Sequence, residues 1–175
     1  MITTPVRIFL VGLPGSGKSH TARWLGRELG LEPIDLDREI EKAEGKTIPE
    51  IFRESGESHF RHLESDRLNA WLAGDSSYIM ATGGGTPCFH GNMDAMNAAG
   101  LTVFLDVAHE IIAARLSGPT SRPLLDGFAD VRERIATLDA ARRSEYEKSA
   151  LVVDSEMNPD ELLGRVRAAL RDRPL

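Results

Sequence analysis

The residues from Gly12 to Ser19 read Gly-Leu-Pro-Gly-Ser-Gly-Lys-Ser and fit the pattern G-x-x-x-x-G-K-[ST] without a gap. The glycines of such a loop let the backbone turn tightly and direct successive N–H groups at phosphate oxygens. Lys18 can then reach the outer phosphates as a point charge, and the Ser19 hydroxyl can ligate Mg²⁺. The alternative interpretation is a glycine-rich turn that binds no ligand.

The residues around this loop favour the phosphate-binding interpretation. Residues 6–11 form a short, mostly apolar run that is typical of a buried strand. After the loop, Ala22, Leu25 and Leu29 recur at helical spacing, and Gly30 predicts the end of that helix. Strand, loop and helix therefore follow one another in the required order, and the positive end of the helix dipole adds to the anion site.

Two acids follow the second predicted strand, which we expect over residues 33–37. At the end of this strand, we expect the Asp35 and Asp37 side chains to diverge and to have different roles. One can order the waters of Mg²⁺, and the other can accept a hydrogen bond from a substrate hydroxyl as a base or an orienting group. The alternative is a helix N-cap, a position at which Asp is favoured.

Arg61 and Glu64 lie three residues apart on a helix predicted over residues 57–73, so they share a face. One interpretation is an exposed ion pair of little consequence. The other is that Glu64 holds the guanidinium so that its fork can bind a substrate carboxylate.

A run of three glycines, residues 83–85, follows a buried strand predicted over residues 78–81. A simple turn is possible, but the missing side chains would also let a substrate ring approach the backbone N–H groups closely.

Three further arginines are candidates for a site. Arg122 lies in a loop, residues 117–129, that reads as long enough to move, and it can close over phosphates and neutralise charge developing during transfer. A solvated loop charge is the alternative. Arg142 and Arg143 fall late in a predicted helix, and the local pattern does not tell which of the two faces a site.

Strands alternate with helices along the chain, which predicts an α/β fold of three layers, with a five-stranded parallel sheet and helices on both faces. Ligands in such folds bind beyond the carboxyl ends of the strands. The phosphate loop, the two acids and the three glycines each follow a strand, so we expect them to converge on one rim. The predicted strands span residues 6–11, 33–37, 78–81, 101–106 and 150–154.

The composition is that of an ordinary soluble domain. The 175 residues carry a net charge of −6, which argues against nucleic acid as the main partner. No apolar run approaches the ~20 residues of a membrane span, and the single cysteine, Cys88, excludes an internal disulfide. We expect one domain over residues 1–175, cytoplasmic and monomeric, without a membrane or nucleic-acid partner.

The motifs together resemble those of the shikimate kinase family, and the likeness covers nearly the whole chain. The order and spacing of these motifs are specific to the family, even where a single motif is not. The resemblance implies a P-loop kinase fold with a mobile lid at about residues 117–129 and substrate-binding helices at about residues 37–73. The matching stretches are Gly12 to Ser19, Asp35-Leu36-Asp37 with Ile40-Glu41, Gly45 with Ile48 to Phe52, Gly56-Glu57, Phe60-Arg61 with Glu64, Gly83-Gly84-Gly85 and Arg122-Pro123-Leu124-Leu125.

The resemblance implies phosphorylation of the 3-hydroxyl of shikimate by MgATP, in the pathway to aromatic amino acids. Asp37 would hold the ring hydroxyls and be the candidate base, with Lys18 and the lid residue Arg122 as the other catalytic groups. Shikimate would be bound by Asp37, Arg61, Glu64, Gly83, Gly84, Gly85 and Arg142, ATP by Gly15, Ser16, Gly17, Lys18, Ser19, His20, Arg115, Arg122 and Pro159, and Mg²⁺ by Ser19 and, through water, Asp35.

The chain departs from the family pattern at two places. By the resemblance, Arg142 would be the second arginine that binds the shikimate carboxylate, four residues before Tyr146. The family usually has a proline between these two residues, where this chain has Ser144, and Arg143 adjoins Arg142. His20 stands where a threonine is common. Two rival hypotheses remain open: another P-loop small-molecule kinase, acting on gluconate or a nucleoside monophosphate, and a non-catalytic nucleotide-binding switch.

Overall fold

The computed structural model describes residues 5–116, 130–154 and 157–172. A five-stranded sheet of order β2-β3-β1-β4-β5 runs through it, and every neighbouring pair is parallel. The central strand β1 (Arg7–Val11) pairs with β3 (Tyr78–Ala81) and β4 (Leu101–Asp106). The edges are β2 (Glu32–Asp35) and β5 (Leu151–Asp154), which confirms the predicted sheet.

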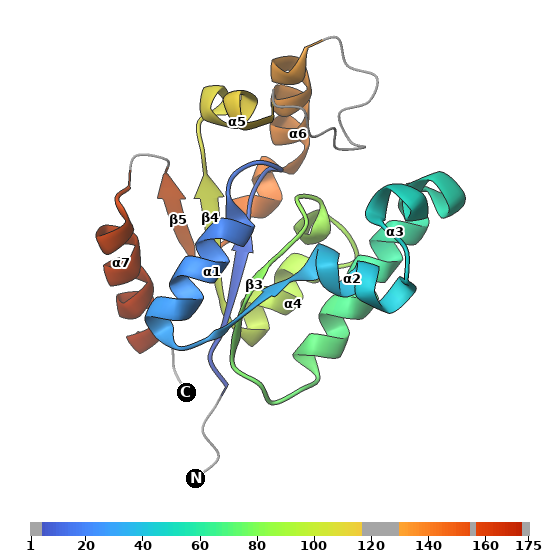
Figure 1. Cartoon of the computed structure of the whole chain (residues 1–175). Helices are drawn as coiled ribbons and strands as arrows, with labels where there is room; N and C mark the ends of the chain where they lie inside the picture. The colour runs from blue at the N-terminus through green and yellow to red at the C-terminus, as the bar shows by residue number, and fades with distance from the viewer. Residues whose placement is uncertain (1–4, 117–129, 155–156, 173–175) are drawn as a thin grey trace.

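Helices cover both faces of the sheet (Figure 1). Alternate residues of β1 point to opposite faces: Ile8 and Leu10 pack with α1 (Lys18–Leu29) and α7 (Pro159–Arg171). Phe9 and Val11 pack on the other side. That second face is covered by α2 (Leu36–Glu44), α3 (Ile48–Leu72), α4 (Asn92–Ala99), α5 (His109–Leu116) and α6 (Val131–Tyr146), with the short 3₁₀ helix η1 (Thr86–Cys88) beside them.

Local signals set the ends of the helices that carry site residues. Gly17 is the N-cap of α1 with φ 93°, a left-handed conformation that glycine adopts without strain. Thr47 and Glu50 form a capping box that begins α3. Gly56, at φ 77° and ψ 175°, interrupts α3 just before the helix that the sequence predicts over residues 57–73. Arg61 and Glu64 therefore lie on the second segment of α3, directly after the interruption.

The predicted end of one strand was wrong. The strand expected over residues 33–37 ends at Asp35, and α2 begins at Leu36. The Asp35 carboxylate accepts a hydrogen bond from the Arg38 backbone N–H at 3.3 Å, so Asp35 is the N-cap. Asp37 consequently lies in the first turn of α2, and the helix sets the direction of its side chain.

No helix within the described part of the chain is both long and apolar enough to cross a bilayer. Residues 117–129, for which a lid is predicted and which include Arg122, lie outside the described residues. The carboxyl ends of β1, β2 and β3 lead into the phosphate loop, the two acids and the glycine run. The fold thus sets up a candidate site at that rim.

Candidate active site

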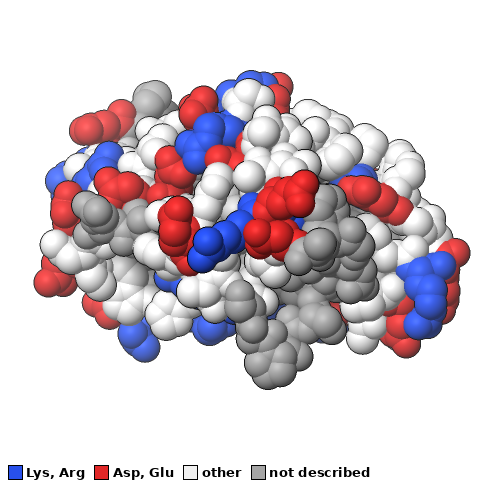
Figure 2. Space-filling view, turned by 90° about the horizontal axis from the view of Figure 1, so that it is seen from above, with Lys and Arg blue, Asp and Glu red and all other residues white. Residues whose placement is uncertain are grey.

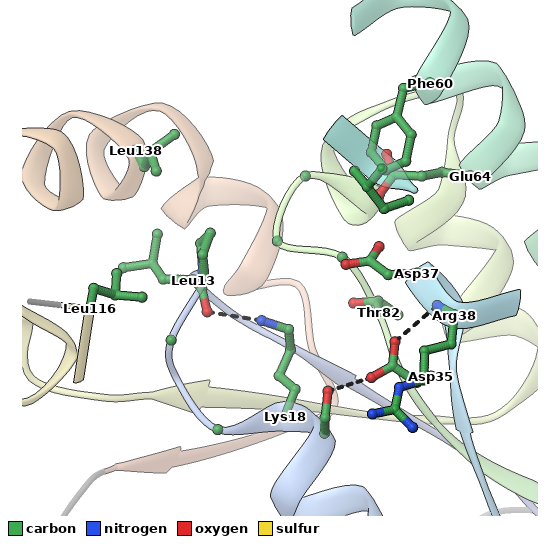
Figure 3. Close-up of a pocket in the computed structure, with 18 of the residues that line it drawn as sticks. Leu13, Lys18, Asp35, Asp37, Arg38, Phe60, Glu64, Thr82, Leu116 and Leu138 are labelled. Atoms are coloured by element: carbon green, nitrogen blue, oxygen red, sulfur yellow. Dashed lines mark hydrogen bonds between the residues drawn. The ribbon is translucent and has the colours of Figure 1, made fainter. Parts of the chain in front are cut away.

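The loop between β1 and α1 has the backbone of a phosphate cradle. Gly12, Gly15 and Gly17 all have positive φ, at 141°, 82° and 93°. The Lys18 ammonium is buried over the loop, where it donates hydrogen bonds to the carbonyls of Gly12 and Leu13 at 2.8 and 2.9 Å. Figure 3 shows the bond to Leu13. The carbonyl groups of the loop therefore hold the Lys18 ammonium in place within the protein alone.

Ser19 and Asp35 form a pair of oxygen donors beside this lysine. The Ser19 hydroxyl donates to Asp35 Oδ2 at 2.7 Å (Figure 3). A hydroxyl and a carboxylate are hard oxygen ligands of the kind that Mg²⁺ takes together with phosphates and waters. The donor chemistry thus fits the predicted metal role of these two residues.

A cavity of about 550 Å³ lies over the rim, and we call it the central cavity. Lys18 on the phosphate loop and Arg61 on α3 both line it, as do Asp35 and Asp37. Figure 3 shows Asp37 on the same side as Glu64 and Thr82, facing the space across which Lys18 lies. Two cationic side chains far apart in the sequence therefore border one cavity that carboxylates also line.

Arg61 is buried and held by two carboxylates. Its side chain is 3% exposed, and its Nη1 donates to Glu64 Oε2 at 2.7 Å. Its Nη2 and Nε donate to Glu57 Oε1 at 2.7 and 3.2 Å. Burial acts to lower the pKa of Arg61, but Glu64 and Glu57 outweigh it and raise the pKa, so the guanidinium stays charged. This is not the exposed ion pair that the sequence left open.

Glu64 is fixed from its other side as well. Its side chain is 1% exposed, and Oε1 accepts a hydrogen bond from the Thr86 hydroxyl at 2.6 Å. Because both carboxylate oxygens have donors, the buried charge is compensated, as buried charges must be. Arg61 is therefore oriented by a rigid partner.

The three glycines leave room for charged side chains. A Cβ on Gly83 would come within 2.4 Å of Glu64 Oε1 and 3.2 Å of Asp37 Oδ1, and one on Gly85 within 2.4 Å of Arg61 Nη1. A Cβ on Gly84 would meet the Pro14 ring at 2.7 Å and Arg142 Nη1 at 3.2 Å. None of the three has a positive φ, so close approach rather than backbone conformation requires glycine here.

Arg142 and Arg143 face different surroundings. Arg142 is 7% exposed, does not line the central cavity and lies behind Gly84, and its Nη1 is buried without a hydrogen-bond partner among the described residues. Arg143 binds Asp106 through both terminal nitrogens, at 2.9 and 3.1 Å, and Asp139 through Nε at 3.0 Å. Arg142 is therefore the arginine beside the glycine run, while Arg143 joins α6 to the end of β4.

The remaining predicted residues divide into three groups. Arg115 and His20 line the central cavity, and Arg115 Nη1 donates to the Gly15 carbonyl at 3.1 Å. Ser16 is buried in the loop, and Pro159 begins α7 and is not a lining residue. Arg122 falls outside the described residues. The cavity lining contains Gly15, Gly17, Lys18, Ser19, His20, Asp35, Asp37, Arg61, Glu64, Gly83, Gly84, Gly85 and Arg115.

The site includes residues to which the sequence interpretation gave no role. Glu57 binds Arg61 from one helical turn before it, and the i, i+4 spacing is a signal that could have shown this. Thr86 anchors Glu64, but no local pattern links residues 22 positions apart. Phe52 and Phe60, whose ring centroids are 4.7 Å apart, also line the cavity and give one wall an apolar surface.

The electrostatic surface at this end of the molecule is mixed in sign. In the view from above in Figure 2, Lys and Arg side chains are interspersed with Asp and Glu, and no continuous basic field is visible. The buried cationic side chains among the described residues are those of Lys18, Arg61 and Arg142. A buried charge is screened less by salt and water than an exposed one.

A phosphate cradle, a hydroxyl–carboxylate pair for a metal ion, an acidic residue and a buried guanidinium around one cavity define the class of P-loop small-molecule kinases. The model of the shikimate kinase family matches residues 14–171. The chain belongs to the shikimate kinase family. It has shikimate kinase activity, in the shikimate pathway, and uses ATP.

Individual relatives agree with this family. The chain is 39% identical to a shikimate kinase of Persephonella marina over 91% of its own length and 98% of that protein. The structure of a shikimate kinase from Acinetobacter baumannii in complex with shikimate matches with a TM-score of 0.87 and 29% identity, over 98% of this chain and 96% of that one. A gluconokinase from Sinorhizobium meliloti, at 17% identity and a TM-score of 0.56, over 96% of this chain and 93% of that one, shares the fold alone.

Proposed function

We propose that this chain transfers the γ-phosphoryl group of ATP to the 3-hydroxyl of shikimate, with the acceptor bound between Asp37 and Arg61. The observation that carries the proposal is that Lys18 and Arg61 line one central cavity. A small acid with ring hydroxyls needs both a guanidinium for its carboxylate and an acceptor for its hydroxyls. Arg61 and Asp37 supply these two groups on the same side of the cavity.

At the donor end, the loop residues Gly15 to Ser19 and His20 bind the phosphates, and Lys18 neutralises the outer ones. The positive φ values of Gly15 and Gly17 support this, since they turn the loop backbone around an anion. On phosphate binding, Lys18 exchanges its bonds to the Gly12 and Leu13 carbonyls for bonds to phosphate oxygens. Arg115 and Pro159 flank the nucleotide base, and Arg122 closes over the transferred group.

Mg²⁺ is held by the Ser19 hydroxyl, with Asp35 acting through a water. The 2.7 Å hydrogen bond between the two side chains supports a shared position. When bound, the ion neutralises charge on the phosphates and orients them for transfer. Asp35 also caps α2, so its carboxylate is held in place by the backbone.

At the acceptor end, Arg61 and Arg142 bind the shikimate carboxylate, and the Gly83–Gly85 edge contacts the ring. The buried Arg142 Nη1, which has no hydrogen-bond partner among the described residues, supports the choice of Arg142 over Arg143. Asp37 accepts the hydrogen bond of the 3-hydroxyl and orients or removes its proton as the oxygen–phosphorus bond forms. The bond between the γ-phosphorus and the bridging oxygen breaks, and ADP leaves.

We further propose that residues 1–175 act as a single catalytic domain and as a monomer. One sheet with a core on each face supports the first statement. For the second, the large apolar side chains exposed among the described residues are scattered: Val6, Phe89, Ile111 and Val152. Light scattering on the eluting peak of a gel-filtration column should give the mass of one chain, and twice that mass would contradict it.

The test is a panel of acceptors assayed with MgATP: shikimate, gluconate and a nucleoside monophosphate. We expect turnover with shikimate and a phosphate on its 3-hydroxyl, read by phosphorus–proton NMR correlation. Turnover of another acceptor with no reaction of shikimate would contradict the proposal. Replacing MgATP by ATP with a chelator should abolish turnover. Adding Mg²⁺ in excess of the chelator should then restore it.

A further inference from the structure

Glu57 is hydrogen-bonded to part of the Arg61 guanidinium, the group that the proposed function assigns to the substrate carboxylate. A guanidinium carries N–H groups on Nε, Nη1 and Nη2. Glu57 Oε1 accepts from Nε at 3.2 Å and from Nη2 at 2.7 Å, whereas Glu64 accepts from Nη1. The Nε–Nη2 edge, which can bind a carboxylate with two parallel hydrogen bonds, is thus covered by an acid of the chain itself.

The two acids of Arg61 differ in how firmly they are held. Glu64 is 1% exposed and bound on its other oxygen by Thr86. Moving it would leave a buried guanidinium and a buried hydroxyl without partners, which is costly. The Glu57 side chain is 54% exposed, and its hydrogen bonds within the described part of the chain are those to Arg61. Water can replace those bonds at little cost when Glu57 turns outward.

The charges around Arg61 also favour release of Glu57 when a substrate carboxylate binds. One guanidinium with two carboxylates carries a net charge of one negative, which repels a substrate carboxylate. With Glu57 turned into solvent, Arg61 and Glu64 form a neutral pair, and Arg142 nearby adds a positive charge. Glu57 directly follows Gly56, where a Cβ would meet no atom within 4 Å, so the chain has open space there.

We propose that Glu57 is an exchangeable counter-ion of Arg61: its carboxylate occupies the guanidinium edge that the shikimate carboxylate takes, and it turns into solvent when shikimate binds. This inference rests on the proposed role of Arg61. It makes Glu57 an internal competitor that weakens binding of any carboxylate at this edge. Only a ligand that also engages Asp37 and the glycine edge then displaces it.

The test compares Glu57→Gln with the wild type in steady-state kinetics. Glutamine keeps the size of the side chain and removes the competing charge, so we expect the KM for shikimate to fall about three- to tenfold. The kcat and the KM for ATP should change less than about twofold, since Glu57 contacts Arg61 and not the phosphate loop. The matched control is Glu54→Gln, an exposed acid of the same helix that pairs with Lys46 and should leave all constants unchanged.

A second variant, Glu57→Asp, tests whether the effect comes from contact with the Nε–Nη2 edge of Arg61 or from the negative charge at position 57. Aspartate keeps the charge but is one methylene too short to reach Arg61, so it should resemble Glu57→Gln. A KM for shikimate that rises in both variants would overturn the proposal and make Glu57 a residue that positions Arg61; an unchanged KM would also overturn it. A wild-type protein inactive on shikimate would instead contradict the proposed function itself.

Discussion

Two arginines of the described residues are each hydrogen-bonded to two carboxylates and lie over a phenylalanine ring, yet of these two only Arg61 lines the central cavity. Arg61 binds Glu57 and Glu64 and lies 4.7 Å from the ring centroid of Phe89. Arg143 binds Asp106 and Asp139 and lies 5.6 Å from that of Phe104. We refer to these as the Arg61 cluster and the Arg143 cluster.

The clusters differ in burial and in what they border. The Arg61 side chain is 3% exposed and lines the central cavity, whereas Arg143 is 36% exposed and does not line it. Arg143 joins the end of β4 to α6, and His109 on α5 also contacts Asp139 at 3.0 Å. An arginine hydrogen-bonded to two acids thus borders the proposed acceptor site in one place and ties helices to the sheet in the other. What the cluster borders, rather than its composition, decides its role.

The largest effect should come from Lys18, which stands on the donor side of the cavity and outside both clusters. Lys18→Ala should lower kcat on the order of a hundred- to a thousandfold, because a preorganised charge at the transferred group is lost. The circular dichroism spectrum should not change. Lys42→Ala, an exposed lysine on α2, is the control and should keep full turnover. Near-normal kcat in a folded Lys18→Ala protein would contradict the phosphate role.

The next effect separates the two clusters directly. Arg61→Lys keeps a cation beside the buried Glu64 but loses the planar fork, so the KM for shikimate should rise about tenfold or more. The KM for ATP should stay the same. Arg143→Lys should change the KM for shikimate less than about twofold and instead lower the melting temperature by about 2–4 °C. A rise in the KM for shikimate in Arg143→Lys, with only a lower melting temperature in Arg61→Lys, would contradict the proposed difference between the two clusters.

A smaller change tests how the glycine edge makes room for Arg61. Gly85 has φ −92°, which alanine adopts freely, but its Cβ would lie 2.4 Å from Arg61 Nη1. Gly85→Ala should therefore displace the guanidinium and raise the KM for shikimate several-fold without a loss in ATP binding. Gly164→Ala, in α7 with no atom within 4 Å of its Cβ position, should leave the KM unchanged. Equal kinetics of the two variants would show that Arg61 does not depend on this space.

The smallest effect concerns Cys88, which lies near both Arg61 and Arg142. Burial raises the pKa of the Cys88 thiol, and the two arginines act against this without reversing it. A raised pKa means less thiolate at any given pH, so alkylation by iodoacetamide at pH 8 should be slower than for a free cysteine. The rate should still be rising above pH 9. Fast alkylation at pH 7 would show that the arginines prevail over burial.

The sequence predicted the sheet and the phosphate loop because their signals are local. Residues 78–81 and 101–106 form strands with the predicted bounds, since short buried runs have few other options. Asp37 was misplaced because aspartate is favoured both after a strand and at a helix N-cap, and here Asp35 caps α2 two residues before the predicted end of the strand. The local pattern does not distinguish the two possibilities.

Which of Arg142 and Arg143 lies beside Gly84 could not be predicted without tertiary information. Consecutive helical residues point about 100° apart, so only one of the pair can face Gly84, and which one depends on how α6 is rotated against the sheet. Asp106, 37 positions before Arg143, hydrogen-bonds to it and so directs Arg143 toward the end of β4. The link between Thr86 and Glu64 is likewise a contact between separate elements. Such pairings depend on packing, and no periodicity within one segment encodes them.

The most direct test of the account is a crystal structure of the chain with shikimate and a non-hydrolysable ATP analogue. We predict the γ-phosphate at the backbone N–H groups of the Gly12–Ser19 loop, the shikimate carboxylate against the Arg61 guanidinium, and a ring hydroxyl on Asp37. A shikimate carboxylate bound at Arg143, or anywhere that leaves Arg61 paired only with its two glutamates, would contradict it.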